Sequence, residues 1–191
     1  MTVILYSAFA PFNYIATAFF LNTWLKDSNN REEAQNIAGF LMSVPFIIAI
    51  FLVPLLGTNI FIAGYFIDRF GKRAYLLIFA SFLSVITYTL FYLINPIVPV
   101  IINGISYSIF AGVIWSSISF VIKPELTGFG YGMISSMLNV AMVFMPLFIA
   151  HIVTTTHNYF NAILFFIVLS CLSFTISIII AKVDNDKNSI I

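Results

Sequence analysis

The sequence predicts an all-α membrane protein with six transmembrane helices. Of its 191 residues, 61% are hydrophobic and 8% are charged, whereas about a quarter of the residues in a soluble domain are charged. The mean hydropathy is +1.06. The apolar residues gather into stretches that reach the roughly twenty residues a helix needs to cross a bilayer. The six predicted spans cover residues 2–24, 37–67, 74–94, 98–122, 129–152 and 159–181, and a polar tail follows at 182–191.

The same composition excludes several classes of function. A formal net charge of +1 provides no basic face for nucleic acid. The single cysteine, Cys171, excludes disulfides within the chain and cysteine zinc sites. We interpret His151 and His157, which have no carboxylate neighbour, as interfacial polar residues rather than metal ligands. Because the sequence also lacks a nucleophile elbow and a phosphate loop, we expect no enzyme, cofactor or metal.

The first span, residues 2–24, starts directly after Met1 without a basic segment or a cleavage site, which argues against a signal peptide. Because the sequence begins inside its first helix, we expect a fragment, or a half that requires a partner half or a second copy. Asn13, Tyr14 and Thr17 place polar groups within this apolar stretch. Such groups are expected to face protein or water rather than lipid.

The second span, residues 37–67, follows a hydrophilic loop at 26–35 and is too long for an upright helix. It contains Pro45 and Pro54, each of which removes a backbone donor. We expect this helix to bend, tilt or extend beyond the membrane. The third span, residues 74–94, is followed by a turn-forming Asn-Pro pair.

A charged corner joins the second and third spans. It combines two glycines, which favour close approach and a turn, with one carboxylate and three cations. Its residues are Gly64, Asp68, Arg69, Gly71, Lys72 and Arg73. A charge at the centre of a bilayer costs on the order of 3 kcal/mol. The corner is therefore expected at a membrane surface.

The fourth span, residues 98–122, is unusually polar for a helix in lipid. It contains Asn103, Ser106, Tyr107 and Trp115 together with further serines. A serine-rich stripe serves helix packing at least as often as it serves binding, so both interpretations stay open.

The fifth span, residues 129–152, begins among Gly128, Gly130 and Gly132 and contains Asn139. The glycine spacing differs from that of dinucleotide-binding and phosphate-binding loops. We interpret these glycines as a helix face that packs closely against a neighbour.

The basic residues predict an orientation. If the loops alternate between the two sides, six basic residues lie on one side, namely Arg69, Lys72, Arg73, Lys123, Lys182 and Lys187, and two on the other, namely Lys26 and Arg31. Cytoplasmic loops carry the excess of Lys and Arg. The corner, the loop that contains Lys123 and both chain termini are therefore predicted to be cytoplasmic.

The corner carries a family resemblance. Its pattern Gly-x-x-x-Asp-Arg-x-Gly-Lys-Arg, which starts at Gly64, resembles the signature loop of the major facilitator superfamily. That loop joins the second and third helices of each six-helix half, so the resemblance implies one half of the twelve-helix major facilitator fold. The stretch from Gly104 to Trp115, followed by Pro124-Glu125 and Tyr131-Gly132, further resembles the C-terminal half of lysosomal dipeptide transporters within that superfamily.

The resemblance implies alternating-access transport of a small solute. Its finer implications are dipeptide uniport from the lysosome to the cytosol and a glycosylated accessory subunit. Because the acids and bases of the sequence fall in loops or at helix ends, passive transport fits at least as well as proton coupling. The tail ends Asp-Lys-Asn-Ser-Ile-Ile, which loosely resembles an acidic dileucine signal for lysosomal sorting. The alternatives are a carrier of a sugar or organic anion, and a membrane interaction protein that does not transport.

The resemblance also implies site residues. Candidates for the substrate cavity are Asn13, Tyr14, Thr17, Asn103, Ser106, Tyr107, Trp115 and Asn139. For each of them, hydrogen bonding between helices is an equally good interpretation. In the corner, Asp68 is expected to cap the fifth helix near Gly128 and to act as a cytoplasmic gate. The alternative for this carboxylate is a solvated ion pair with Arg69 or Arg73.

Overall fold

The computed structural model describes residues 31–57, 73–94 and 97–186, and all regular structure within these ranges is helical. The elements are α2 (Arg31–Gly57), α4 (Arg73–Leu93), α5 (Ile97–Val121), the short 3-10 helix η1 (Pro124–Leu126), α6 (Thr127–Thr156) and α7 (Tyr159–Asp186). The predicted span at 2–24 lies outside the described residues, so the count of six helices stays a prediction.

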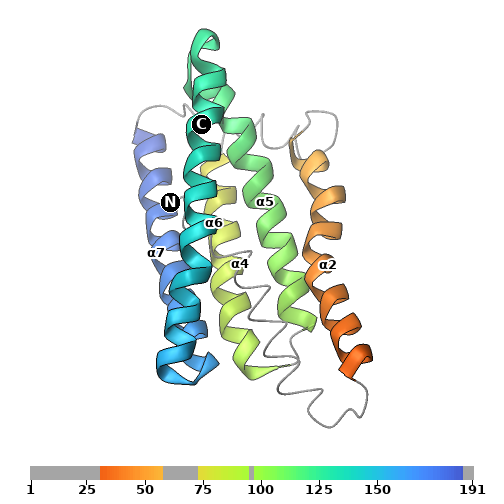
Figure 1. The fold of residues 1–191 in the computed structure, drawn as a ribbon. Helices are drawn as coiled ribbons and strands as arrows, with labels where there is room; N and C mark the ends of the chain where they lie inside the picture. The colour runs from red at the N-terminus through yellow and green to blue at the C-terminus, as the bar shows by residue number, and fades with distance from the viewer. Residues whose placement is uncertain (1–30, 58–72, 95–96, 187–191) are drawn as a thin grey trace.

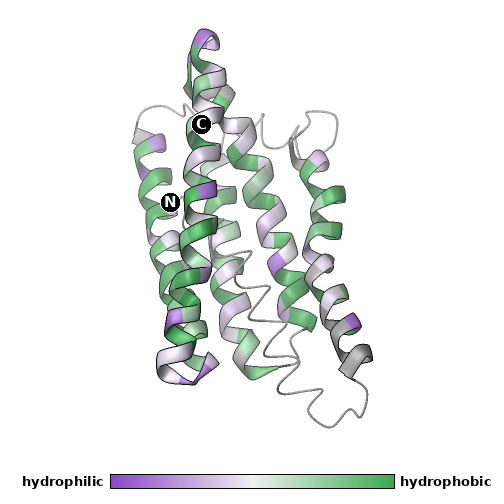
Figure 2. Ribbon diagram, in the orientation of Figure 1, coloured by the Kyte–Doolittle hydropathy of each residue, from purple (hydrophilic) through white to green (hydrophobic). Residues whose placement is uncertain are grey.

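Four stretches within the described ranges are long and apolar enough to cross a membrane: Ala74–Phe91, Ile97–Trp115, Pro124–Thr156 and Tyr159–Asn185. Helix α2 contributes a shorter apolar stretch, Gly39–Pro54. Figure 2 shows apolar residues along the length of these helices. The chain is therefore a multi-pass membrane protein.

Three helix boundaries differ by four residues or more from the sequence-based expectation. Helix α6, expected to end at residue 152, continues to Thr156. Helix α2 begins at Arg31, inside the segment expected to be a loop. Helix α7 continues to Asp186, so the first part of the expected tail is helical. No glycine or proline interrupts residues 182–186, so this stretch contains no residue that breaks a helix. A drop in hydropathy marks the edge of the membrane there, but it does not end the helix.

The helices form a row in the order α2, α5, α4, α7, and α6 lies beside this row and contacts α5 and α7 (Figure 1). At the contact between α2 and α5, residue 104 is a glycine, so no side chain separates the two backbones. A Cβ added there would lie 2.9 Å from the Cα of Pro45 and 3.0 Å from a methyl group of Ile48. The backbones of these two helices therefore approach as closely as they do because residue 104 is glycine.

Buried hydroxyl groups join α4 to both of its neighbours. The Oγ atoms of Ser84 and Ser106 lie 2.7 Å apart between α4 and α5. The Oγ atoms of Ser81 and Ser177 lie 2.8 Å apart between α4 and α7. We call these two contacts the serine seams. Small hydroxyl side chains let helices approach closely, and they form hydrogen bonds with one another where no water is available.

Apolar side chains fill the space around the serine seams. Leu77 and Ala80 of α4 pack against Phe110 and Val113 of α5. Nearer the opposite end of α4, the rings of Tyr88 and Phe166 stack with centroids 5.5 Å apart. Helix α4 is thus enclosed from both sides.

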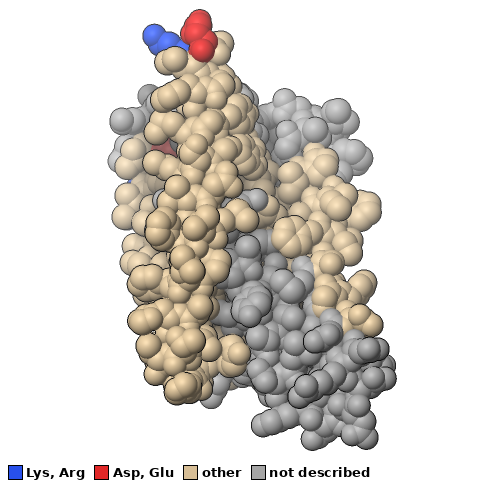
Figure 3. Space-filling model, viewed as in Figure 1, with Lys and Arg blue, Asp and Glu red and all other residues tan. Residues whose placement is uncertain are grey.

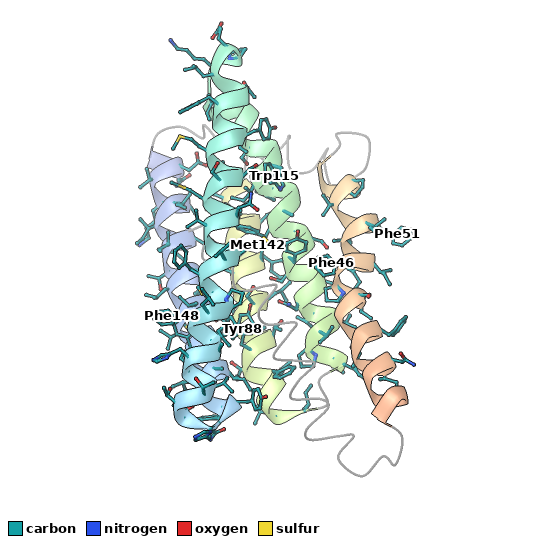
Figure 4. The ribbon with its side chains drawn as sticks, in the orientation of Figure 1. Phe46, Phe51, Tyr88, Trp115, Met142 and Phe148 are labelled. Atoms are coloured by element: carbon teal, nitrogen blue, oxygen red, sulfur yellow. The ribbon has the colours of Figure 1, made fainter. Side chains whose placement is uncertain are left out.

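Helix α6 is the exception in this bundle. Only 12% of its apolar stretch is buried, against 61% for α5. Its exposed side chains include Phe129, Met137, Phe144 and Phe148, and Figure 4 shows Met142 and Phe148 on its surface. This long apolar face is suited to lipid or to a further helix.

The three glycines at the start of α6 were predicted to form one closely packed helix face, and the structure differs. A Cβ added at Gly128 or Gly132 would have nothing within 4 Å, whereas one added at Gly130 would meet the side chain of Ile122. The interpretation as a continuous close-packing face is therefore wrong, since two of the three glycines lie on exposed parts of the helix.

Candidate substrate cavity

Helix α5 carries most of the cavity candidates that the structure describes. Asn103 and Tyr107 lie one turn apart on one face of this helix, since residues four apart share a face. Asn103 is 2% exposed, and within the described part of the chain its Nδ2 has no hydrogen-bond partner. Tyr107 is half-buried. The arrangement presents an amide donor next to a phenol.

Ser106 points in another direction, toward α4. Its hydroxyl donates a hydrogen bond to the carbonyl oxygen of Ala80 at 2.7 Å and lies against Ser84 in the serine seam. In this conformation the side chain serves helix packing, the alternative that the sequence left open.

Trp115 lies near the other end of α5, where that helix meets α6 (Figure 4). Its indole stacks on the ring of Tyr131 with centroids 5.7 Å apart and an interplanar angle of 12°. The hydroxyl of Tyr131 also donates to the carbonyl oxygen of Trp115 at 3.1 Å. We call this pair the aromatic tie. Tyr131 entered the sequence analysis only through the family resemblance and was not a cavity candidate, because its contact with Trp115 depends on how α5 and α6 face each other.

The remaining cavity candidates are not brought together within the described ranges. Asn139 is exposed on α6, so the structure does not place it beside Asn103. Asn13, Tyr14 and Thr17 lie outside the described residues.

Most of the expected gate also lies outside the described residues, namely Gly64, Asp68, Arg69, Gly71 and Lys72, while Arg73 is the first residue of α4. What the structure does describe is the helix end that Asp68 would cap. Helix α6 follows η1, and its N-cap residue Leu126 makes no side-chain capping hydrogen bond. The adjoining residues Lys123 and Glu125 are exposed. Figure 3 shows basic and acidic side chains together at one tip of the molecule.

Asp184 is a further feature that sequence reasoning missed. It was expected in a solvated tail, but it lies in the last turns of α7 and is only 9% exposed. Its burial depends on the continuation of α7 beyond residue 181, which the hydropathy of the tail does not indicate. Among the described residues, no group of three or more His, Cys, Asp or Glu could hold a metal ion.

The long apolar helices and their close packing define a multi-pass membrane protein with polar side chains on one face of α5. The family profile described as Major Facilitator Superfamily matches residues 2–189. The chain therefore belongs to the major facilitator superfamily of membrane transporters, as its charged corner indicated.

Curated relatives come from one kind of transporter. The chain is 24% identical over 170 residues to the lysosomal dipeptide transporter MFSD1 of Mus musculus, which covers 88% of this chain and 33% of the relative. The proteins of the same name from Danio rerio and Bos taurus are each 25% identical over 170 residues, with 34% and 33% of their lengths covered. The chain thus spans about a third of the length of these relatives. No solved structure matches.

Proposed function

We propose that this chain is the C-terminal six-helix half of a transporter that carries dipeptides from the lysosome to the cytosol by alternating access. The substrate class is supported by the relatives, which share 24–25% of residues over 88% of the chain. The observation within the fold that carries the proposal is that the Nδ2 of Asn103 on α5 has no hydrogen-bond partner among the residues that the structure describes.

A buried amide donor without a partner is costly. Leaving such a group unsatisfied costs about 1–3 kcal/mol. A dipeptide offers acceptors that could remove this cost, namely its peptide carbonyl and its carboxylate. We propose that Asn103 donates to one of these oxygens in a conformation of the transport cycle in which the face of Asn103 and Tyr107 is open.

The other proposed contacts follow from the same placement. Tyr107 would add a second donor one turn away, and Trp115 would form an aromatic wall. The charges of the two peptide termini need counter-charges, whereas the Asp, Glu, Lys and Arg residues within the described ranges lie near helix ends or between helices. We propose that the missing half, or a second copy, supplies them, and that transport proceeds by uniport without a coupled proton.

The proposed gate is Asp68, whose carboxylate would cap α6. The side chain of Leu126, the N-cap residue of α6, makes no capping hydrogen bond, and a helix N-terminus attracts an anion; both points support this role. Asp68→Asn is expected to favour the cytoplasm-open state. Unchanged labelling of a cysteine probe on the cytoplasmic side, in a Cys171→Ser background, would contradict the gate.

The decisive test is uptake of a labelled dipeptide into proteoliposomes that contain the intact transporter. Asn103→Leu keeps the branching and the number of heavy atoms of the side chain and removes the donor. We expect KM for the dipeptide to rise about fivefold, as for the loss of one hydrogen bond worth about 1 kcal/mol.

Ser173 provides the matched control. Its Oγ is also buried, and within the described part of the chain it also lacks a hydrogen-bond partner, but it lies on α7. Ser173→Ala is expected to leave KM unchanged. Equal KM values for Asn103→Leu and the unmodified protein would contradict the role of Asn103. Uptake of a sugar or organic anion in place of dipeptides would favour the alternative substrate class, and absence of any uptake would favour a protein that does not transport.

A further inference from the structure

A hollow lies between the first turns of α4 and the last turns of α7. Its volume is about 180 Å³, and it is lined by Tyr75, Ile78, Ile178, Ala181, Lys182 and Asn185. It is separate from the polar face of α5 and from the aromatic tie. None of the transport steps proposed above uses these residues.

The lining follows from helix geometry. Ile178, Ala181, Lys182 and Asn185 have the spacing i, i+3, i+4 and i+7, which places them on one face of α7. On α4, Tyr75 and Ile78 have the spacing i, i+3 and meet that face from the neighbouring helix. The hollow is thus a groove between two fixed helices.

The position along the helices places the groove at a membrane surface. Helix α4 begins two residues before Tyr75, and α7 ends one residue after Asn185. The contact between Ser81 and Ser177 joins the same two helices at 2.8 Å. That contact lies six residues beyond Tyr75, which is about 9 Å deeper along α4. This serine seam therefore holds α4 and α7 together just beneath the groove.

The chemistry of the groove changes with depth. Ile78, Ile178 and Ala181 form an apolar floor, whereas Lys182 and Asn185 are exposed at the outer end. An ammonium and an amide supply hydrogen-bond donors at the level of the headgroups, and the phenol of Tyr75 is an amphipathic side chain suited to the interface.

The local charges favour an anion through Lys182. The N-terminus of α4 contributes partial positive charge at this end, while the C-terminus of α7 contributes partial negative charge. These two contributions oppose each other, so the ammonium of Lys182 determines the sign of the electrostatic potential at the outer end of the groove. Asp184 is buried, and its side chain points away from that of Lys182, because residues two apart on a helix are about 200° apart.

We propose that this groove binds an anionic phospholipid, with the headgroup phosphate at Lys182 and Asn185 and the acyl chain along Ile78, Ile178 and Ala181. A free phosphate would use the polar end and leave the apolar floor empty, whereas a phospholipid matches both. Basic pockets between transmembrane helices recognise lipid headgroups in this way.

The test measures lipid binding to the intact protein in neutral detergent by native mass spectrometry. The probes are phosphatidylglycerol and phosphatidylcholine with the same acyl chains. We expect tighter binding of phosphatidylglycerol. Lys182→Gln should weaken its binding about fivefold and leave phosphatidylcholine unchanged, since one Lys near an anionic headgroup contributes about that factor. Lys182→Arg should retain binding.

Lys123 supplies the matched control, because it is also exposed but lies between α5 and η1, outside the groove. Lys123→Gln should bind phosphatidylglycerol as the unmodified protein does. Asn185→Leu is a second groove variant at an exposed position and should also weaken binding. Equal binding of the two lipids would overturn the proposal, as would equal losses for Lys182→Gln and Lys123→Gln. Displacement of phosphatidylglycerol by an equal concentration of inorganic phosphate would instead indicate a free-anion site and would also overturn it.

Discussion

Helices α5 and α6 are equally apolar, yet they have opposite surroundings. Their apolar stretches have the same mean hydropathy, but 61% of the α5 stretch is buried and 12% of the α6 stretch is buried. In water, such a difference in burial would appear in the sequence as a polar face on the exposed helix. In lipid, an exposed helix must be as apolar as a buried one. Hydropathy therefore identifies both helices as membrane helices and does not reveal their neighbours.

What distinguishes the two regions is the kind of contact that holds them. Helix α5 meets α2 at a glycine and α4 at a serine seam, so its contacts depend on small residues at close range. Helix α6 meets the end of α5 through the aromatic tie between Trp115 and Tyr131, and among the three glycines at the start of α6 only Gly130 lies against this end, beside Ile122. Close packing tolerates little change in side-chain volume, whereas a stack of rings at the edge of a bundle can separate without leaving a cavity in its centre. Three substitutions with matched controls test this difference.

The largest effect is expected at Gly104. Gly104→Ala adds a Cβ only 2.9 Å from the Cα of Pro45, and backbone cannot move aside as a flexible side chain can. We expect a loss of about 1–3 kcal/mol in the free energy of unfolding, which is typical of overpacking. The measurement is the melting temperature of the purified protein in detergent.

Gly132→Ala is the control for this substitution, because a Cβ added there meets nothing within 4 Å. Alanine is the better helix former, so this variant should gain about 0.5–1 kcal/mol. Equal melting temperatures for the two variants would mean that α2 and α5 are not in close contact.

The ends of the central helices could be predicted from the sequence. Helix α4 was expected at 74–94 and covers Arg73–Leu93, and α5 was expected at 98–122 and covers Ile97–Val121. Prolines follow both helices, and the residue before a proline is biased away from helical geometry. The end of α7 has no such signal, which is why five further helical residues were missed.

A smaller effect is expected at the aromatic tie. Trp115→Leu removes the stack on Tyr131 but keeps an apolar side chain. An aromatic pair contributes about 0.5–1.5 kcal/mol beyond its buried area. We expect faster hydrogen exchange in the first half of α6, with little change in α4. Phe129→Leu, at a ring that is 69% exposed, should leave exchange unchanged. Equal exchange in both variants would show that α6 is held by other contacts.

The candidate site was predictable only in part, because residue type and residue direction are separate questions. Asn103 stood out as an amide in an apolar segment, and the structure buries it with no partner for its Nδ2 among the described residues. Its role in a cavity stays a prediction. Ser106 looked similar in the sequence. Three residues along a helix turn a side chain by about 300°, and whether the new direction meets α4 depends on how the two helices are rotated against each other. The spacing of residues within α5 does not specify how α5 is rotated against α4.

The smallest effect is expected at Ser106, and it separates the two interpretations of that residue. If the serine seam is its role, Ser106→Ala and Ser84→Ala should show a coupling free energy of about 0.6 kcal/mol in a double-mutant cycle, the average for hydrogen bonds between membrane helices. KM for the transported dipeptide should stay unchanged. Ser136→Ala, at an exposed serine of α6, should show no coupling to Ser84→Ala. A raised KM for Ser106→Ala without such coupling would instead assign Ser106 to the substrate cavity, because a hydroxyl that binds substrate affects transport without depending on its partner across the seam.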